Sequence, residues 1–283
     1  MGVYRRIVAL AMAAPICLWA IAAGAQGVAL PSLVNPHLRL DAPDLRASPL
    51  LRFLTTDADP PFNFALPDGS LAGYNVDLAR AVCLELKLAC TIQARPLDAL
   101  VDALSKGEGD AVAASVPPNA DARARLAFST PYLPSPARFA TKGPAKRDEP
   151  VAVSPAALAG RAVGVVGGSA HAAFLQRLFP AAKVQTFANL PALEDALLGG
   201  AVEFVFADGA DLSFWLNGTR AAGCCVFAGG PYLDPALFGP GHAIALRPTD
   251  DKLRRAFDWA LMRLQGRGAL AELYLRYFPV ALF

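Results

Sequence analysis

Acidic side chains follow two short apolar runs that are typical of β-strands. Asp57 and Asp59 come after "LRFLT", and Asp208 ends "VEFVFAD". A carboxylate at the carboxyl end of a strand can lie in a cleft, where Asp208 could act as the counter-ion of an amine. Simpler structural roles are also open: Asp59 with Pro60 and Pro61 can form a turn, and Asp208 can cap the helix that follows.

A glycine-containing stretch between a strand and a helix could bind an anion. In "VVGGSAHAAF", Gly167 and Gly168 allow a tight turn, and Ser169 can cap the helix. The N–H groups of Ala170 and His171, at the start of the helix, would then point at a negative group. The alternative is an ordinary strand-to-helix turn.

The stretch "ASVPPNADARARLAFS" combines two adjacent prolines with two arginines. An arginine offers a planar fork that fits a carboxylate with two parallel hydrogen bonds. Arg123, the nearer of the two to Pro117 and Pro118, is the candidate for this role. The alternative, a surface arginine at the start of a helix, fits Arg125 better.

Strands and helices alternate from Leu51 onward, and this alternation must position the polar residues. The first series contains strand-like "LRFLT", "CTIQAR" and "DAVAAS" and helix-like "YNVDLARAVCLELKL" and "LDALVDALSKG". After a break at residues 143–155, a second series runs through "RAVGVV", "SAHAAFLQRLF", "KVQTF", "LPALEDALLGG" and "VEFVFAD". An amphipathic helix at residues 250–265 and "ALAELYLRYF" follow. The pattern predicts an α/β fold of two similar units, each a mostly parallel sheet with helices on both faces, and a cleft between them.

The N-terminal residues have the features of an export signal. A basic head precedes an apolar run that ends in "AGA", a typical cleavage site. We therefore expect a cleaved signal peptide at residues 1–25 and a loose N-terminal extension at residues 26–48. The alternative, an uncleaved membrane anchor, fits poorly with Pro15 inside the run. No later stretch is apolar over the length of a membrane helix.

The balanced charge of the chain and the scattered positions of its cysteines and histidines argue against several functions. The chain has 26 Lys and Arg against 24 Asp and Glu, and removing the two arginines of the expected signal leaves 24 against 24. A balanced surface gives no reason to expect binding to nucleic acid or to an anionic membrane. The cysteines and the three histidines do not match a zinc or iron–sulfur spacing, so we expect no metal and no cofactor.

Cysteines exported to an oxidising compartment can pair. Seven residues of continuous helix would hold Cys83 and Cys90 roughly 10 Å apart, which is too far for a disulfide. They can bridge if the helix ends near Leu88 and Cys90 starts the next strand, and we expect that arrangement. The adjacent Cys224 and Cys225 are ambiguous, and two buried thiols are the simplest interpretation.

As a set, these motifs resemble those of bacterial extracellular solute-binding proteins of family 3, the periplasmic receptors of ABC importers for polar amino acids. The resemblance extends from about Leu51 to Phe278, and the spacing of Cys83 and Cys90 matches a disulfide of some members. The matching stretches are "LRFLTTDADPPFNFALPDGSLAGYNVDLARAVC", "LDALVDALSKGEGDAVAAS", "LAFSTPYL", "LAGRAVGVVGGSAHAAF", "GGAVEFVFAD" and "FGPGHAIALRPTDDKLRRAFDWALMRL".

The resemblance implies a type II periplasmic binding protein with two lobes joined by two hinge strands. Lobe 1 would comprise residues 49–137 and 232–283, and lobe 2 residues 141–228. A ligand would bind in the cleft, the lobes would close over it, and the closed form would dock on an inner-membrane ABC permease. The protein would be a monomer of the periplasm and not an enzyme.

On lobe 1, the resemblance implies that Asp57 contacts the side-chain amine of a basic amino acid. Asp59 and Leu97 stand where relatives carry aromatic platforms, so the pocket gains an acid and loses rings that would stack on a flat cation. Ser115 would offer its backbone carbonyl to the ligand ammonium. Pro117 lacks the hydroxyl and the N–H group usual at its position.

The carboxylate of the ligand would be held by Arg123, which stands one residue after the usual family position. On lobe 2, Asp208 would bind the ammonium, and the helix start at Ser169, Ala170 and His171 would bind the carboxylate. These features predict that the protein binds a small amine-bearing solute, which is an amino acid or a derivative. A cationic ligand is favoured.

Two other functions stay open on the same scaffold. One is a periplasmic enzyme like cyclohexadienyl dehydratase, for which Asp59 or His171 would have to be the general acid. The other is an accessory or sensing protein without a transport role.

Overall fold

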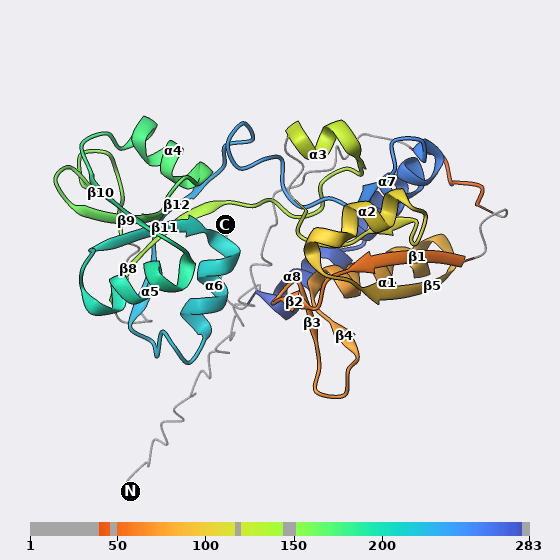
Figure 1. Ribbon diagram of the computed structural model, residues 1–283, viewed down its shortest axis with the longest axis horizontal. Helices are drawn as coiled ribbons and strands as arrows, with labels where there is room; N and C mark the ends of the chain where they lie inside the picture. Colours follow the sequence, from red (N-terminus) through yellow and green to blue (C-terminus); the bar gives the residue numbers. More distant parts are fainter. Residues whose placement is uncertain (1–39, 46–49, 117–119, 144–150, 279–283) are drawn as a thin grey trace, which may run out of the picture.

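The computed structural model describes residues 40–45, 50–116, 120–143 and 151–278, and these residues form two lobes (Figure 1). Each lobe is built around its own five-stranded sheet. The expected signal peptide, most of the expected N-terminal extension, and Pro117 and Pro118 lie outside the described residues. Among the described helices, none combines the length and the apolar character needed to cross a membrane.

The sheet of lobe 1 is mostly parallel. In spatial order its strands are β5 (Ala89–Ala94), β1 (Leu50–Thr55), β6 (Ala111–Val112), β13 (Ala245–Leu246) and β7 (Ala127–Phe128). β1 is parallel to both β5 and β6, whereas β13 is antiparallel to β6 and β7. Only Ala111 and Val112 of the predicted strand "DAVAAS" pair with neighbouring strands, so this strand is much shorter than expected.

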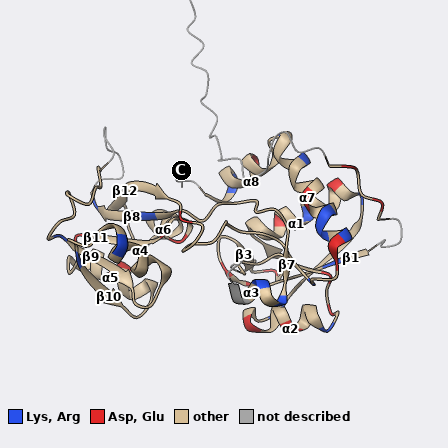
Figure 2. Cartoon of the chain, turned by 90° about the horizontal axis from the view of Figure 1, so that it is seen from above, with Lys and Arg blue, Asp and Glu red and all other residues tan. Residues whose placement is uncertain are grey.

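Helices cover both faces of this sheet. They are α1 (Tyr74–Leu86), α7 (Asp251–Gly266) and α8 (Ala269–Tyr277) on one side, and the 3₁₀ turn η1 (Leu97–Ala99), α2 (Leu100–Ser105) and α3 (Ala120–Arg125) on the other (Figure 2). Successive strand residues point to opposite faces. Accordingly, Phe53 packs in the cluster that contains Phe257 of α7, and Leu54 packs in the cluster that contains Leu100 of α2.

The sheet of lobe 2 follows the same plan. In spatial order its strands are β10 (Lys183–Phe187), β9 (Ala162–Val166), β11 (Phe204–Asp208), β8 (Ala137–Lys142) and β12 (Cys225–Tyr232). Phe206 packs with Phe174 of α4 (Ala170–Leu178), while its neighbour Val205 packs in the cluster of α5 (Leu190–Gly199) and α6 (Gly209–Asn217). The prediction of an α/β fold with helices on both faces of two mostly parallel sheets is therefore confirmed.

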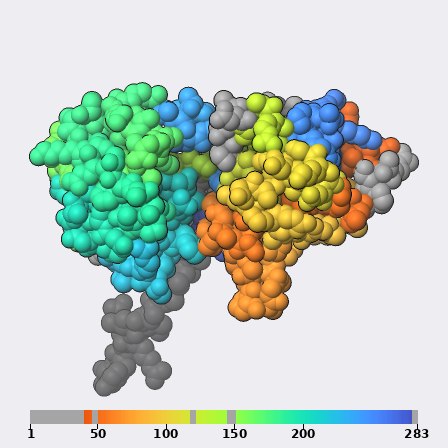
Figure 3. All heavy atoms as spheres, in the orientation of Figure 1, coloured from red at the N-terminus to blue at the C-terminus, as the bar shows by residue number. Residues whose placement is uncertain are grey.

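β8 and β12, which lead from one lobe to the other and stand where the family resemblance implies hinge strands, lie side by side in lobe 2. β8 pairs with β12 antiparallel, and it pairs with β11 antiparallel on its other edge. Ala137, where β8 begins, is opposite both Asp208 and Tyr232. The two lobes form separate masses that meet near the middle of the molecule (Figure 3). The connection between the lobes thus runs directly beside Asp208.

A small antiparallel sheet of lobe 1 was not expected from the sequence. It consists of β2 (Ala58–Asp59), β3 (Asn63–Ala65) and β4 (Leu71–Ala72). The turn between β2 and β3 contains Pro60 and Pro61, and the Phe62 N–H donates to the Asp59 carbonyl oxygen at 2.8 Å. The turn predicted at Asp59-Pro60-Pro61 is therefore present.

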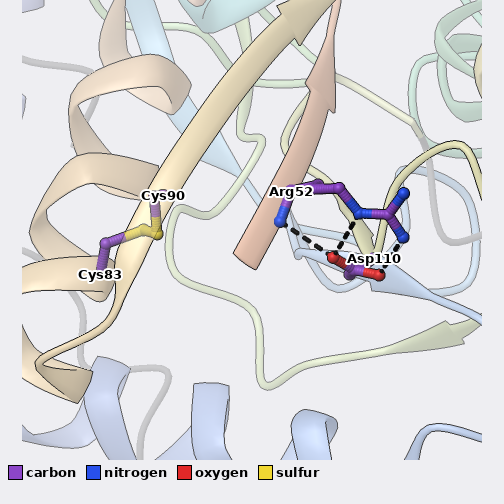
Figure 4. The surroundings of a disulfide bond; sticks show 4 residues. All are labelled: Arg52, Cys83, Cys90 and Asp110. Carbon is purple, nitrogen blue, oxygen red and sulfur yellow. Dashed lines mark hydrogen bonds and ion pairs between the residues drawn. A yellow bond between two sulfur atoms is a disulfide. The ribbon is translucent and has the colours of Figure 1, made fainter. Parts of the chain in front are cut away.

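The disulfide between Cys83 and Cys90 is confirmed (Figure 4). α1 ends at Leu86, and Lys87 turns the chain with a φ of 57°, so that Cys90 falls within β5 with its Cα atom 6.2 Å from that of Cys83. Cys224 and Cys225 also form a disulfide, which corrects the interpretation as two buried thiols. Neighbouring residues in an extended chain usually point their side chains to opposite sides. Here a turn at Ala222 and Gly223, both with positive φ, directly precedes the cysteines, and β12 begins only at Cys225. The side chains of Cys224 and Cys225 can therefore meet.

Candidate functional site

A pocket of about 620 Å³ lies at the end of the lobe 1 sheet that carries the first predicted acids. It contains four of the predicted site residues, Asp57, Asp59, Leu97 and Ser115, and it also contains Arg95. Arg95 directly follows β5, and its guanidinium lies 3.9 Å from the Glu108 carboxylate. Its position after a strand end could have marked it in the sequence.

The Asp59 side chain is partly withdrawn from water. Burial raises the pKa of Asp59, and a contact with the Ser115 side chain partly offsets this rise. The Ser115 hydroxyl is itself buried, and its oxygen makes no hydrogen bond of ordinary geometry within the described ranges. The Ser115 hydroxyl thus lies enclosed beside the Asp59 carboxyl, and of these two side chains it is Asp59 that remains partly accessible.

Buried polar side chains hold the loop that bears Asp57 and Asp59. Asn63 donates to Thr55 Oγ1 and, at 3.0 Å, to the Ala113 carbonyl oxygen. The Asn75 amide donates to Asn63 Oδ1 at 2.8 Å, and the Tyr132 hydroxyl donates to Asn75 Oδ1 at 2.7 Å. Since Asn63 and Asn75 are fully buried, this network fixes the loop on both sides of the two acids.

Asp208 ends β11 and caps α6. Its carboxylate accepts from the N–H groups of Ala210 at 2.8 Å and Asp211 at 3.4 Å, so the capping role considered from the sequence is real. Burial nevertheless raises the pKa of Asp208 to about 6, and repulsion from Asp59 contributes to the rise. Asp59 of lobe 1 thus acts on the pKa of Asp208 in lobe 2.

Asp211 is a third acid at this junction, and sequence reasoning missed it. It lies on the first turn of α6. Asp211 is exposed at the surface of lobe 2, yet partial desolvation by the surrounding protein and the carboxylates of Asp208 and Asp59 raise its pKa. We call Asp59, Asp208 and Asp211 the interlobe acids. Three acids that repel one another across a junction indicate a place where positive charge would be stabilising.

The start of α4 has the predicted capping geometry. The Ser169 hydroxyl accepts from the Ala172 N–H at 3.2 Å and donates to the Val166 carbonyl oxygen at 2.7 Å. Ala170 and His171, as the first residues of the helix, have N–H groups without an acceptor inside it. The helix start can therefore bind an anion.

The His171 ring does not carry charge at neutral pH. It stacks on Phe238 with ring centroids 4.9 Å apart and meets Phe206 edge-on at 5.7 Å. Burial lowers the pKa of His171 to about 4. Any part of His171 in anion binding would thus come from its backbone.

Arg123 lies on α3 and is exposed. Its guanidinium packs over the ring of Phe128, 5.5 Å from the ring centroid. It does not line the pocket that holds Asp57 and Asp59. Arg125 forms a surface ion pair with Asp102 at 2.7 Å, in keeping with the surface role considered for it.

Within the described residues, no group of three or more His, Cys, Asp or Glu side chains could hold a metal ion. The arrangement instead offers negative charge from both lobes and hydrogen-bond donors at one helix start.

Comparison with known proteins settles the family. The model of the family "Bacterial extracellular solute-binding proteins, family 3" matches residues 51–280. The chain belongs to this family. The resemblance seen in the sequence motifs is thereby confirmed.

Curated relatives of this family 3 protein are named for binding cationic amino acids. It is 30% identical over 241 residues to the L-arginine-binding protein of Pseudomonas aeruginosa, covering 84% of this chain and 92% of that protein. It is 26% identical over 232 residues to a putative ABC transporter arginine-binding protein 2 of Escherichia coli, covering 82% and 92% of the two chains. Both names describe binding proteins.

Solved structures with the same fold include open and ligand-bound forms. The family 3 protein matches the second substrate-binding domain of Lactococcus lactis GlnP in an open conformation, with a TM-score of 0.70, 16% identity, and coverage of 88% of this chain and 100% of that one. The match to a Silicibacter pomeroyi binding protein in complex with lysine has a TM-score of 0.56 and 22% identity, and covers 81% and 96%. These likenesses confirm the two-lobe type II fold.

Proposed function

We propose that the protein is the periplasmic substrate-binding component of an ABC importer and that it binds a cationic amino acid or a close derivative between its lobes. The observation that carries the proposal is the approach of acids from both lobes: Asp211 of lobe 2 lines a pocket together with Ala58 and Pro60, the two neighbours of Asp59 in lobe 1. Asp59 comes from lobe 1 and raises the pKa of Asp208 on lobe 2. A positively charged ligand group placed between them relieves this repulsion.

Each part of the ligand then has a partner of suitable chemistry. The side-chain amine lies near Asp57 and Asp59, and the α-ammonium near Asp208 and the Ser115 carbonyl. The carboxylate meets the start of α4 at Ser169, Ala170 and His171. Arg123 would join them as the cationic partner if its side chain turned from Phe128 toward the cleft. Leu97 lines the apolar wall. The names of the curated relatives support the cationic class.

Lobe closure follows from the same charges. Without a ligand, bringing Asp59 closer to Asp208 strengthens their repulsion, so the open form is favoured. A bound cation attracts both carboxylates, so that bringing the lobes together becomes favourable and the closed form is preferred. The closed lobes would form the surface that an inner-membrane permease recognises, as in the hinge closure of other periplasmic binding proteins.

Isothermal titration calorimetry with L-arginine, L-lysine, L-glutamate and L-leucine tests the proposal. We expect binding of at least one cationic amino acid and no binding of glutamate. Asp208→Asn should weaken that binding by about tenfold or more, because asparagine keeps the helix cap but loses the charge.

Asp102→Asn, which removes a surface acid of lobe 1, serves as the control and should leave the affinity unchanged. Binding of glutamate with no response to arginine or lysine would contradict the proposal. Permease and ATPase genes beside the gene for this protein would support the importer role.

A further inference from the structure

A second pocket, of about 660 Å³, lies between the lobes beside α6. Its lobe 1 wall contains Ala58 and Pro60, and its lobe 2 wall contains Pro191 of α5 and Phe214 of α6. All four of these residues are exposed. In Figure 3, the cyan surface of the α6 region faces the orange surface of lobe 1 at this junction. Exposed apolar groups of both lobes therefore border the same gap.

Phe214 is held on the outer face of α6. Its neighbours Ser213 and Trp215 are buried, whereas Phe214 is 50% exposed. It is also the one aromatic ring among the large apolar side chains that are exposed in the described part of the chain. Asp211 and Gly218 lie three and four residues away, and therefore on the same face of the helix. Since both of them line the pocket too, this face of α6 is the one that borders the gap.

The lobe 1 wall is a fixed surface. The turn that carries Pro60 is held on one side by the hydrogen bond from the Phe62 N–H to the Asp59 carbonyl oxygen, at 2.8 Å. On its other side, the Tyr74 N–H donates to the Pro61 carbonyl oxygen at 3.0 Å. The ring of Pro60 has almost no rotamer freedom to lose. An apolar group that packs on this turn therefore orders little of lobe 1.

Closing the lobes would take apolar surface out of water at this gap. Both lobes bound the pocket, so a rotation about β8 and β12 that closes the cleft brings its walls together. Apolar area that leaves water favours the state in which it is buried. Because half of Phe214 is exposed in this structure, that gain belongs to the closed form. The ring does not line the pocket of Asp57 and Asp59, which places it outside the candidate ligand pocket.

We propose that Phe214 is a closure latch: when the lobes close over a ligand, its ring packs against Ala58 and Pro60 of lobe 1 and stabilises the closed form without touching the ligand. The inference rests on the proposed function, since a bound ligand is what brings the lobes together. Phe214 is thus a positioning residue. It increases the affinity for every ligand that closes the protein, by a similar factor, and does not decide which ligand binds.

Calorimetric titration of Phe214→Ala tests the effect on affinity. The variant should bind L-lysine and L-arginine about fivefold more weakly than wild type, with a similar factor for both. Phe214→Leu keeps most of the apolar area and should lose about twofold or less. Leu178→Ala removes an exposed side chain of lobe 2 that does not line this pocket, and should change neither affinity. Melting curves of ligand-free wild type and Phe214→Ala should coincide, because the ring stabilises the closed form alone.

Labelling of an introduced thiol tests the burial directly. The four cysteines of the described residues are paired in disulfides, so Phe214→Cys adds the one free thiol among them. Saturating L-lysine should slow its reaction with a maleimide at least about fivefold, because the position becomes covered. Peptide mass spectrometry identifies the labelled position. Leu178→Cys is the matched control and should react equally fast with and without lysine.

The outcomes separate the latch from the proposed function. If wild type binds lysine or arginine, but Phe214→Ala binds them equally well and lysine does not protect Phe214→Cys, the latch is disproved and the proposed function stands. A loss for one of the two ligands alone would mean that the ring touches the ligand, which also disproves the latch. So would a change of molecular mass in Phe214→Ala by light scattering, since the ring would then contact a second copy.

A different ligand would still allow the latch to be judged. If wild type binds glutamate and no cationic amino acid, the proposed ligand class is wrong. Both measurements are then made with glutamate, and the same losses and protection at Phe214 support the latch. If wild type binds none of the amino acids, the proposed function and the latch are both disproved.

Discussion

Asp208 has the capping role that the sequence offered, and its position leaves the proposed ligand-binding role open to the same side chain. Its carboxylate caps α6 through two backbone N–H groups, and the same carboxylate is buried at the junction of the lobes. The backbone hydrogen bonds favour the charged form, but burial and the nearby Asp59 outweigh them. A residue that serves as a cap can therefore also hold a carboxylate whose charge state responds to a ligand.

The affinity for a cationic ligand should depend on pH through Asp208. In the ligand-free protein the pKa of Asp208 is raised to about 6, so this carboxylate is ionised above that pH and protonated below it. Lowering the pH from 7.5 to 5 should reduce the affinity for lysine or arginine roughly tenfold, because the ammonium binds the ionised form. Both ligands keep their charge over this range, and burial already keeps the pKa of His171 at about 4.

Titrations at several pH values on wild type and Asp208→Asn provide the measurement. The variant should bind more weakly at pH 7.5 and show a flatter pH profile. An unchanged profile in Asp208→Asn would assign the pH dependence to another group.

At the scale of elements, the regular strands and helices were predictable and the short ones were not. The strand–helix alternation predicted β1, α1, β9, α4 and β11, because each of these buries a periodic apolar face in a core. The small sheet of β2, β3 and β4 was missed, since its strands are two or three residues long and lack such a face. Asp57 and Asp59 could be recognised from their place after a strand, whereas Asp211 could not, because its importance depends on a neighbour from the other lobe.

The buried amide of Asn63 should be the main support of the loop between β1 and β3. Asn63→Ala removes its hydrogen bonds to Thr55 and Ala113 and leaves Asn75 with an unpaired donor. We expect a loss of roughly 2–4 kcal/mol in the free energy of unfolding, together with weaker lysine binding, because the acids on the loop lose their fixed positions.

Urea unfolding followed by circular dichroism measures this loss. Asn217→Ala is the matched control: its amide donates to the Ser213 carbonyl oxygen near the end of α6, and its removal should cost at most about 1 kcal/mol. Equal losses in the two variants would mean that the network has no special role in holding the loop.

At the scale of the whole molecule, the sequence predicted two lobes but not their separation. Each lobe has its own sheet and core clusters, so its internal packing follows from apolar periodicity. The angle between the lobes depends instead on residues far apart in the sequence, including charges that oppose one another, such as Asp59 and Asp208.

Ligand binding should therefore make the molecule more compact. Small-angle X-ray scattering with and without saturating L-arginine or L-lysine measures this as a fall in the radius of gyration, since the lobes rotate toward each other about the connecting strands β8 and β12. Asp208→Asn should need a higher ligand concentration for the same change, because the ligand then stabilises the closed form less. If calorimetry detects saturation of wild-type protein while the scattering curve stays the same, the ligand binds to one lobe alone, and the interlobe acids do not control closure.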